Sequence, residues 1–89
     1  MITSNDIDEL SPPLRAILDY ELRAGNKVVE TWRGWPKATS IGVILDDPLT
    51  TPKEGLPKGI TYNYLNDPHY WREELVDGET NHVLATKFK

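Results

Sequence analysis

The chain has no cysteine and no long apolar run, and these absences exclude several classes of protein. Without cysteine there is neither a disulfide framework nor a thiolate metal site. The longest uncharged apolar run, residues 41–45, is far shorter than the roughly 20 residues of a membrane-spanning helix. Residues 1–6 lack the basic and apolar segments typical of a signal peptide. We therefore expect a cytoplasmic protein with no membrane partner.

Clustered positive charge is also missing. The formal net charge is −4, and the lysine and arginine residues are scattered along the chain. Nucleic-acid binding requires a basic patch that displaces counterions from phosphates. The sequence therefore argues against a nucleic-acid partner.

The common catalytic and cofactor motifs are absent as well. There is no G-x-S-x-G elbow, no P-loop and no G-x-G-x-x-G, and the six glycines are isolated. We expect no cofactor, and we leave open whether the chain is an enzyme, favouring a non-catalytic role.

What is present suits one small globular domain. Hydrophobic residues make up 38% of the 89 positions and charged residues 27%, values typical of a soluble fold. Two cores would each be too small to be stable, so residues 1–89 should form a single domain. Residues 3–10 could form a short acidic helical turn anchored by Ile7 and Leu10; the alternative is that residues 1–10 fray.

A helix over residues 11–26 is the clearest local prediction. Leu14, Ile17, Leu18 and Leu22 form one apolar stripe at helical spacing. Ser11 can cap the first turn with its hydroxyl, Pro12 suits the first helical position, and Gly25 can end the helix in the left-handed conformation.

Five extended runs follow this helix, at residues 27–33, 39–45, 60–65, 71–76 and 82–88. Residues 39–45 read as an interior strand, in which Gly42 leaves a hole that a neighbouring aromatic ring can fill. Residues 46–58 hold three prolines and should be a loop. The predicted fold is α+β: an N-terminal helix packed on one face of a mostly antiparallel sheet of four or five strands, ending in a C-terminal β-hairpin.

Asp77-Gly78 suggests a tight turn in that hairpin. A two-residue turn would pair Val76 with Glu79, Glu73 with His82 and Trp71 with Leu84; a four-residue turn would shift the partners but keep the faces. On these registers Trp71, Glu73 and Leu75 share a face with His82, Leu84, Thr86 and Phe88. The alternative is a short helix from Pro68 to Leu75, capped by Asp67.

The densest polar and aromatic segment is residues 66–71. With Glu73 and His82 nearby, His69 could take part in general acid–base chemistry, which gives the alternative function of a small hydrolase or ligand-binding enzyme with His69, Glu73 and His82 in a pocket. The spacing argues against a metal site, because a strand places His69 and Glu73 about 13 Å apart. A cross-strand Glu73–His82 pair that only sets the register is the simpler interpretation.

Large aromatic residues are numerous for one small core. Tryptophan and tyrosine are enriched in protein interfaces because they bury a large area and keep a polar group. We therefore favour a non-catalytic interaction domain (an inhibitor, immunity-type or accessory protein) that binds a protein partner, with a homodimer also possible. The candidate binding residues are Trp35, Asp67, His69, Tyr70 and Trp71.

Four segments together resemble a group of small, uncharacterised bacterial proteins: residues 10–18 (LSPPLRAIL), 24–26 (AGN), 34–36 (GWP) and 66–71 (NDPHYW). The resemblance lies in the order of the motifs and covers most of the chain. It implies one intact small domain in a bacterial cytoplasm and carries no activity or site residue with it.

Overall fold

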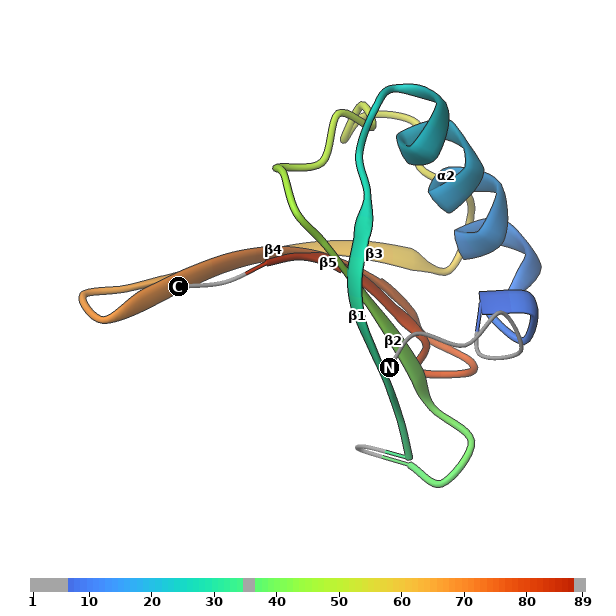
Figure 1. Ribbon diagram of the computed structural model, residues 1–89. Helices are drawn as coiled ribbons and strands as arrows, with labels where there is room; N and C mark the ends of the chain where they lie inside the picture. The colour runs from blue at the N-terminus through green and yellow to red at the C-terminus, as the bar shows by residue number, and fades with distance from the viewer. Residues whose placement is uncertain (1–6, 35–36, 88–89) are drawn as a thin grey trace.

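The computed structural model describes residues 7–34 and 37–87, in which a helix of 12 residues is followed by five strands (Figure 1). The predicted α+β class is confirmed. The elements are α2 (Pro12–Arg23), β1 (Val28–Arg33), β2 (Ile41–Leu45), β3 (Ile60–Asp67), β4 (Tyr70–Asp77) and β5 (Val83–Thr86).

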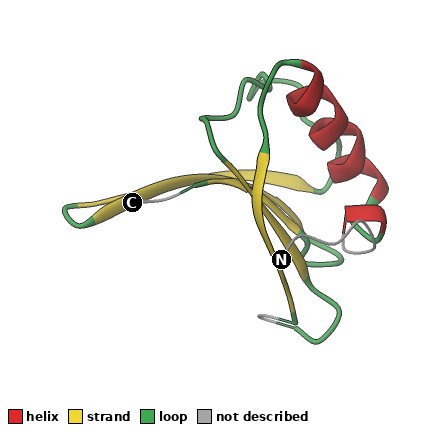
Figure 2. Ribbon diagram, viewed as in Figure 1, coloured by secondary structure: helices red, strands yellow, loops and turns green. Residues whose placement is uncertain are grey.

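The strands form one sheet in the order β1-β2-β5-β4-β3. All neighbouring strands are antiparallel except β2 and β5, which run parallel. Helix α2 lies on one face of this sheet, and within the described residues no other helix of comparable length covers the opposite face (Figure 2). No helix in the described part of the chain has the length and apolar character needed to cross a membrane.

The core lies between α2 and the central strands. All five residues of β2 are buried, as expected for an interior strand, and β5 is largely buried beside it. Ile7 and Leu10, the predicted anchors of the N-terminal turn, pack with this core. Its fully buried members (within 1% exposure) are Leu14, Leu18, Ile41, Val43, Leu45, Leu75 and Leu84.

Gly42 faces Trp32 of the adjacent strand β1, as the sequence suggested for an aromatic neighbour. A Cβ atom added at Gly42 would lie 1.7 Å from Cε2 of Trp32. The indole ring therefore occupies the space over the glycine, and only glycine leaves room for it there.

The two ends of α2 differ from each other in how well the sequence predicted them. Gly25 has a φ of 103°, and the N–H groups of Gly25 and Asn26 bond to the carbonyls of Leu22 and Glu21, the Schellman arrangement. At the other end Ser11 is the N-cap residue, but its hydroxyl makes no capping bond. That prediction was wrong: Pro13 at the second helical position has no N–H for the hydroxyl to bind, and the hydroxyl lies near the Asp77 carboxylate instead.

The predicted apolar stripe of α2 was wrong in its last member. Leu22 is 40% exposed, whereas Glu21 is fully buried. The segment after β2 approaches the Glu21 side of the helix and supplies hydrogen bonds to its carboxylate. At the end of the stripe the buried residue is therefore Glu21, whose carboxylate is hydrogen-bonded, and not the apolar Leu22.

Strands β4 and β5 are adjacent and antiparallel, as predicted, but the turn between them is longer than expected. Val76 pairs with Val83 and Leu75 with Leu84, so the pairings of Glu73 with His82 and Trp71 with Leu84 were wrong. Gly78 does not have the positive φ that a type I′ turn requires. Because the shift is by an even number of residues, Leu75 and Leu84 still share the core face.

The tight turn lies instead between β3 and β4. Asp67 pairs with Tyr70 around Pro68 and His69, and the Asp67 carboxylate accepts the N–H of His69 at 2.9 Å. Residues 70–77 are a strand, so the alternative of a helix from Pro68 was wrong. Asp67 acts as a turn residue, not as a helix cap.

Candidate interaction surface

The hairpin of β3 and β4 extends beyond the rest of the sheet (Figure 1). β4 pairs with β3 over its whole length but with β5 only from Glu74 to Val76. Residues 64–73 therefore form a two-stranded projection, which we call the hairpin arm. In Figure 1 it points away from α2.

Four of the five predicted binding residues lie on this arm. Asp67 and His69 are in its terminal turn, and Tyr70 and Trp71 begin its second strand. Tyr70 is exposed and Trp71 half-buried. The fifth residue, Trp35, lies outside the described residues.

The arm also presents apolar side chains that the sequence analysis did not single out. Tyr64 is 55% exposed and Leu65 is 40% exposed, and both lie on β3. Their alternation along the strand places them on opposite faces of the arm. In the register of the two strands, Tyr70 shares the face of Leu65 and Trp71 shares the face of Tyr64, so aromatic rings occur on both faces.

A polar cluster holds the base of the arm. The Tyr62 hydroxyl donates to Glu73 Oε2 at 2.7 Å, and the N–H of Leu49 donates to Glu73 Oε1 at 3.0 Å. Lys53 lies 3.8 Å from the same carboxylate and 4.9 Å from the centroid of the Tyr62 ring. These contacts join both strands of the arm to the loop between β2 and β3.

Burial and the Glu73 carboxylate raise the pKa of Tyr62 to about 12. Burial is the larger cause, since it disfavours the charged phenolate. The carboxylate adds to it because it accepts the phenol proton and repels a phenolate. Tyr62 is therefore a neutral hydrogen-bond donor throughout the physiological pH range.

His82 has a structural environment. Its Nδ1 accepts the N–H of Ser11 at 2.8 Å, and its Nε2 lies 3.1 Å from the carbonyl oxygen of Thr39. In this arrangement Nε2 carries the proton, and the ring links the start of α2 to the segment before β2.

The hydrolase alternative required His69, Glu73 and His82 to meet in one pocket. Each has different partners: His69 lies in the exposed turn of the arm, Glu73 bonds to Tyr62, and His82 is buried beside Ser11. No hydrogen bond between any two of the three is found among the described residues. In the same part of the chain no three histidine, aspartate or glutamate side chains gather as a possible metal site.

Asp77 organises the turn between β4 and β5. Its Oδ1 accepts the N–H groups of Glu79 at 2.8 Å and Thr80 at 3.2 Å. Burial raises the pKa of Asp77, but the nearby Ser11 hydroxyl, these two N–H groups and His82 outweigh burial and hold that pKa below its usual value. The Ser11 hydroxyl lies near the carboxylate without meeting strict hydrogen-bond geometry.

Glu21 is the buried charge that sequence reasoning missed. Its carboxylate accepts the N–H groups of Thr50 and Thr51, the hydroxyls of both, and the amide of Asn26. Burial raises the pKa of Glu21, but these hydrogen bonds outweigh it and lower the pKa. In the sequence, the only trace of this contact is the pair Thr50-Thr51 in a proline-rich loop, and nothing in that pattern points to Glu21.

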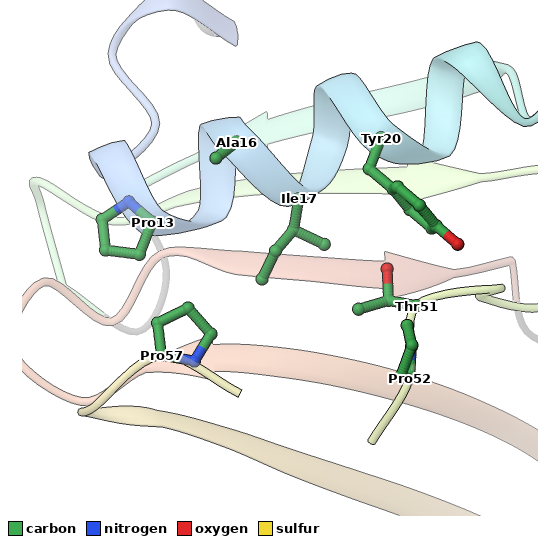
Figure 3. A pocket seen from close by; sticks show the side chains of 7 residues that line it. All are labelled: Pro13, Ala16, Ile17, Tyr20, Thr51, Pro52 and Pro57. Carbon is green, nitrogen blue, oxygen red and sulfur yellow. The ribbon is translucent and has the colours of Figure 1, made fainter. Parts of the chain in front are cut away.

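An apolar groove of about 430 Å³ lies between α2 and this loop (Figure 3). It is lined by Pro13, Ala16, Ile17, Tyr20, Thr51, Pro52 and Pro57. Apart from the Tyr20 hydroxyl, the only polar side chain in the lining is that of Thr51, and its hydroxyl is engaged by Glu21. The groove therefore offers few groups that could orient or activate a substrate.

The fold and the arm define a small α+β protein whose most projecting part is an aromatic two-stranded hairpin. Comparisons with protein-family models, with curated proteins and with solved structures found no match.

Proposed function

We propose that this protein is a non-catalytic protein-interaction domain, of the inhibitor, immunity or accessory kind, whose working part is the hairpin arm. The observation that supports this most strongly is the exposure of Tyr64, Leu65 and Tyr70 on a projecting hairpin whose base is held by the Tyr62–Glu73 hydrogen bond. Exposed rings of this kind are the usual anchors of protein interfaces, because they bury a large area at low entropic cost.

The chemistry of the arm favours a protein over other partners. Its exposed residues combine apolar and hydrogen-bonding groups, and the chain carries a net charge of −4 without a basic cluster. A phosphate backbone or an anionic membrane surface would be repelled by that charge. The proposed setting is a bacterial cytoplasm, supported by the motif resemblance and by the absence of cysteine.

The turn of the arm would contribute specificity. Asp67 and His69 present polar groups at the tip, and Trp71 lies half-buried beside Tyr70. A partner that covers the tip would bury the rings of the two strands and meet these polar groups at the rim. This arrangement of apolar anchors with a polar rim is typical of protein interfaces.

The test compares substitutions on the arm with matched substitutions elsewhere. The arm variant is Tyr64→Ser with Tyr70→Ser, and the control is Tyr20→Ser with Leu22→Ser on α2, which removes exposed apolar groups outside the arm. Proteins retained by the immobilised full chain are identified by mass spectrometry. The affinity of each retained protein is then measured by calorimetry with purified components.

We expect one protein to bind the wild type and the control equally well, and the arm variant roughly 30-fold more weakly, as for the loss of an interface hot spot. Circular dichroism must show that both variants remain folded. Equal binding by the arm variant and the control would exclude the arm as the interaction surface.

A further inference from the structure

β3 is an edge strand with few of the features that usually protect an edge. Among the described residues β4 is its one neighbouring strand, and its eight residues pair with β4 in a regular register without a bulge. From Ile60 to Asn66 it contains no proline and no charged residue. Such strands are templates for pairing with a strand of another chain.

The backbone groups that face the free edge can be assigned from β4. The N–H of Glu73 donates to the Thr86 hydroxyl at 3.1 Å, on the β5 side, so it does not point toward β3. Tyr64, which lies opposite Glu73, therefore belongs to a pair without backbone hydrogen bonds. It follows that Tyr62, Tyr64 and Asn66 direct their N–H and C=O groups to the free edge.

The opposite edge of the sheet is protected. β1 has a register shift between Val28 and Glu30, and it carries Glu30 and Arg33. Arg33 forms an ion pair with Glu9 of the N-terminal turn. A bulge and charged side chains are the devices that keep an edge from pairing, so the two edges are not equivalent.

We propose that β3 pairs antiparallel with β3 of a second copy of this chain across a two-fold axis near Tyr64. The two five-stranded sheets would then join into one continuous sheet. Tyr62 of one copy lies opposite Asn66 of the other in this arrangement, and the outward N–H and C=O groups bond in pairs. A closed two-fold contact uses one edge of each copy and leaves the protected β1 edges outside.

The charges along the strand fit a second copy better than a charged peptide. Although each chain has a net charge of −4, the strand is uncharged between Ile60 and Asn66, so no like charges face each other in its centre. Antiparallel pairing also brings Asp67, at the end of one β3 strand, toward the start of the other copy's β3 strand. The exposed Lys58 precedes that start. The contact is therefore neutral at its centre and complementary at its ends.

This inference concerns the backbone edge of β3 and does not depend on the proposed function, which concerns the side chains of the arm. A chain that stays monomeric could still bind a protein through the arm. A dimer could likewise form without any such partner.

The experiment measures the molar mass of the full chain by light scattering and sedimentation over a range of concentrations. Tyr64→Val keeps the N–H and removes the ring, whereas Tyr64→Pro also removes an outward N–H without breaking the ladder to β4. Asn63→Lys places two like charges, one from each copy, close to the two-fold axis. Within each chain the new lysine lies opposite the carboxylate of Glu74, so the folded monomer should accept it. Val29→Lys adds the same charge at the exposed β1 edge as a matched control.

We expect a dimer for the wild type and for Val29→Lys, at most a few-fold weaker dimerisation for Tyr64→Val, and a loss of roughly tenfold or more for Tyr64→Pro and Asn63→Lys. If Tyr64→Pro does not fold, Asn63→Lys decides.

The amides of Tyr62, Tyr64 and Asn66 should exchange slowly with deuterium only at dimer-forming concentrations. A monomeric wild type would overturn the proposal, as would a dimer unaffected by Asn63→Lys. So would protection of these amides that appears only on adding a different protein.

Discussion

The two edges of the sheet are built on different physical principles. The β1 edge is held by packing, since Trp32 fills the space over Gly42 and the strand is distorted by a bulge. The β3 edge is held by polar contacts at its base, where Tyr62 donates to Glu73 and the same carboxylate accepts the N–H of Leu49 from the preceding loop. Beyond that base β3 continues into the arm, where it stays paired with β4 as far as Asp67 and Tyr70.

This difference makes the β3 edge the better candidate for contact with a partner. A bulged, charged edge resists pairing at any concentration, because a second strand cannot bond to it in register. A regular, uncharged edge with exposed rings accepts a strand or an apolar surface without rearrangement. The proposals of an interaction on the β3 side therefore rest on two observations, the regular backbone of this edge and the exposure of its side chains.

The largest effect is expected on the packed side. Gly42→Ala would place a Cβ atom 1.7 Å from the Trp32 ring, so the indole must leave its position. We expect a loss of about 2–3 kcal/mol in the free energy of unfolding, as for overpacking in a well-packed site. Urea denaturation followed by tryptophan fluorescence measures it.

The control is a double-mutant cycle with Trp32→Ala. Once the ring is absent, Gly42→Ala should cost less than about 0.5 kcal/mol, because alanine is tolerated in a strand at least as well as glycine. An equal cost in both backgrounds would mean that the ring is not what excludes a side chain at Gly42. The packed edge would then have to be explained differently.

The sequence predicted the parts of the fold that depend on local pattern. The strong periodicity of residues 14–18 and the Gly25 stop indicated α2 correctly, and the apolar run of residues 41–45 indicated the central strand. The hole at Gly42 was likewise visible, because a glycine within a buried strand needs a neighbour to fill the space.

What failed depended on contacts between distant segments. Glu21 is buried because Thr50 and Thr51 reach it from a loop nearly 30 residues away, a contact with no local signature. The turn after β4 differs from the expected one because the Asp77 carboxylate binds two N–H groups of a longer loop. Both cases are side-chain-to-backbone hydrogen bonds that override a propensity.

The candidate site was predicted only in part. The segment containing Asp67, His69, Tyr70 and Trp71 was chosen for its density of polar and aromatic residues, and it does lie on the projecting arm. Tyr64 and Leu65 were not selected, because a strand that alternates apolar and polar residues looks like core until its neighbours are known. Whether a partner uses these residues stays a prediction.

A smaller effect is expected where the chain leads into β3. Glu21→Gln keeps the shape of the side chain but removes the charge that holds Thr50 and Thr51, and we expect a loss of about 2 kcal/mol near neutral pH. Because the folded pKa of Glu21 lies below its ordinary value of 4.5, the stability that the carboxylate supplies is present above that value. It is lost as the pH falls through the folded pKa, so the two curves should converge in acid.

The matched control for this change is Glu54→Gln, since Glu54 is an exposed carboxylate of the same loop. It should leave the free energy of unfolding unchanged within about 0.5 kcal/mol at every pH. Denaturant titrations of the three proteins from neutral to acid pH measure the difference. A constant gap between wild type and Glu21→Gln across that range would contradict the lowered pKa.

The smallest effect is expected at the base of the arm, and it runs in the opposite direction with pH. Tyr62→Phe removes the hydroxyl that donates to Glu73 and should cost about 1 kcal/mol at pH 7. The folded pKa of Tyr62 is raised from 10.0 to about 12, so the stability that its hydroxyl contributes is complete below pH 10 and is lost as the pH rises through 12.

Tyr64→Phe is the control, because Tyr64 lies on the same strand and has an exposed ring. Alkaline denaturation should therefore distinguish Tyr62→Phe from both other proteins, whose stability falls between pH 10 and 12 while that of Tyr62→Phe falls less. If all three curves were parallel, the arm would be anchored by its apolar contacts alone, and the contrast between a packed edge and a polar-anchored edge would disappear.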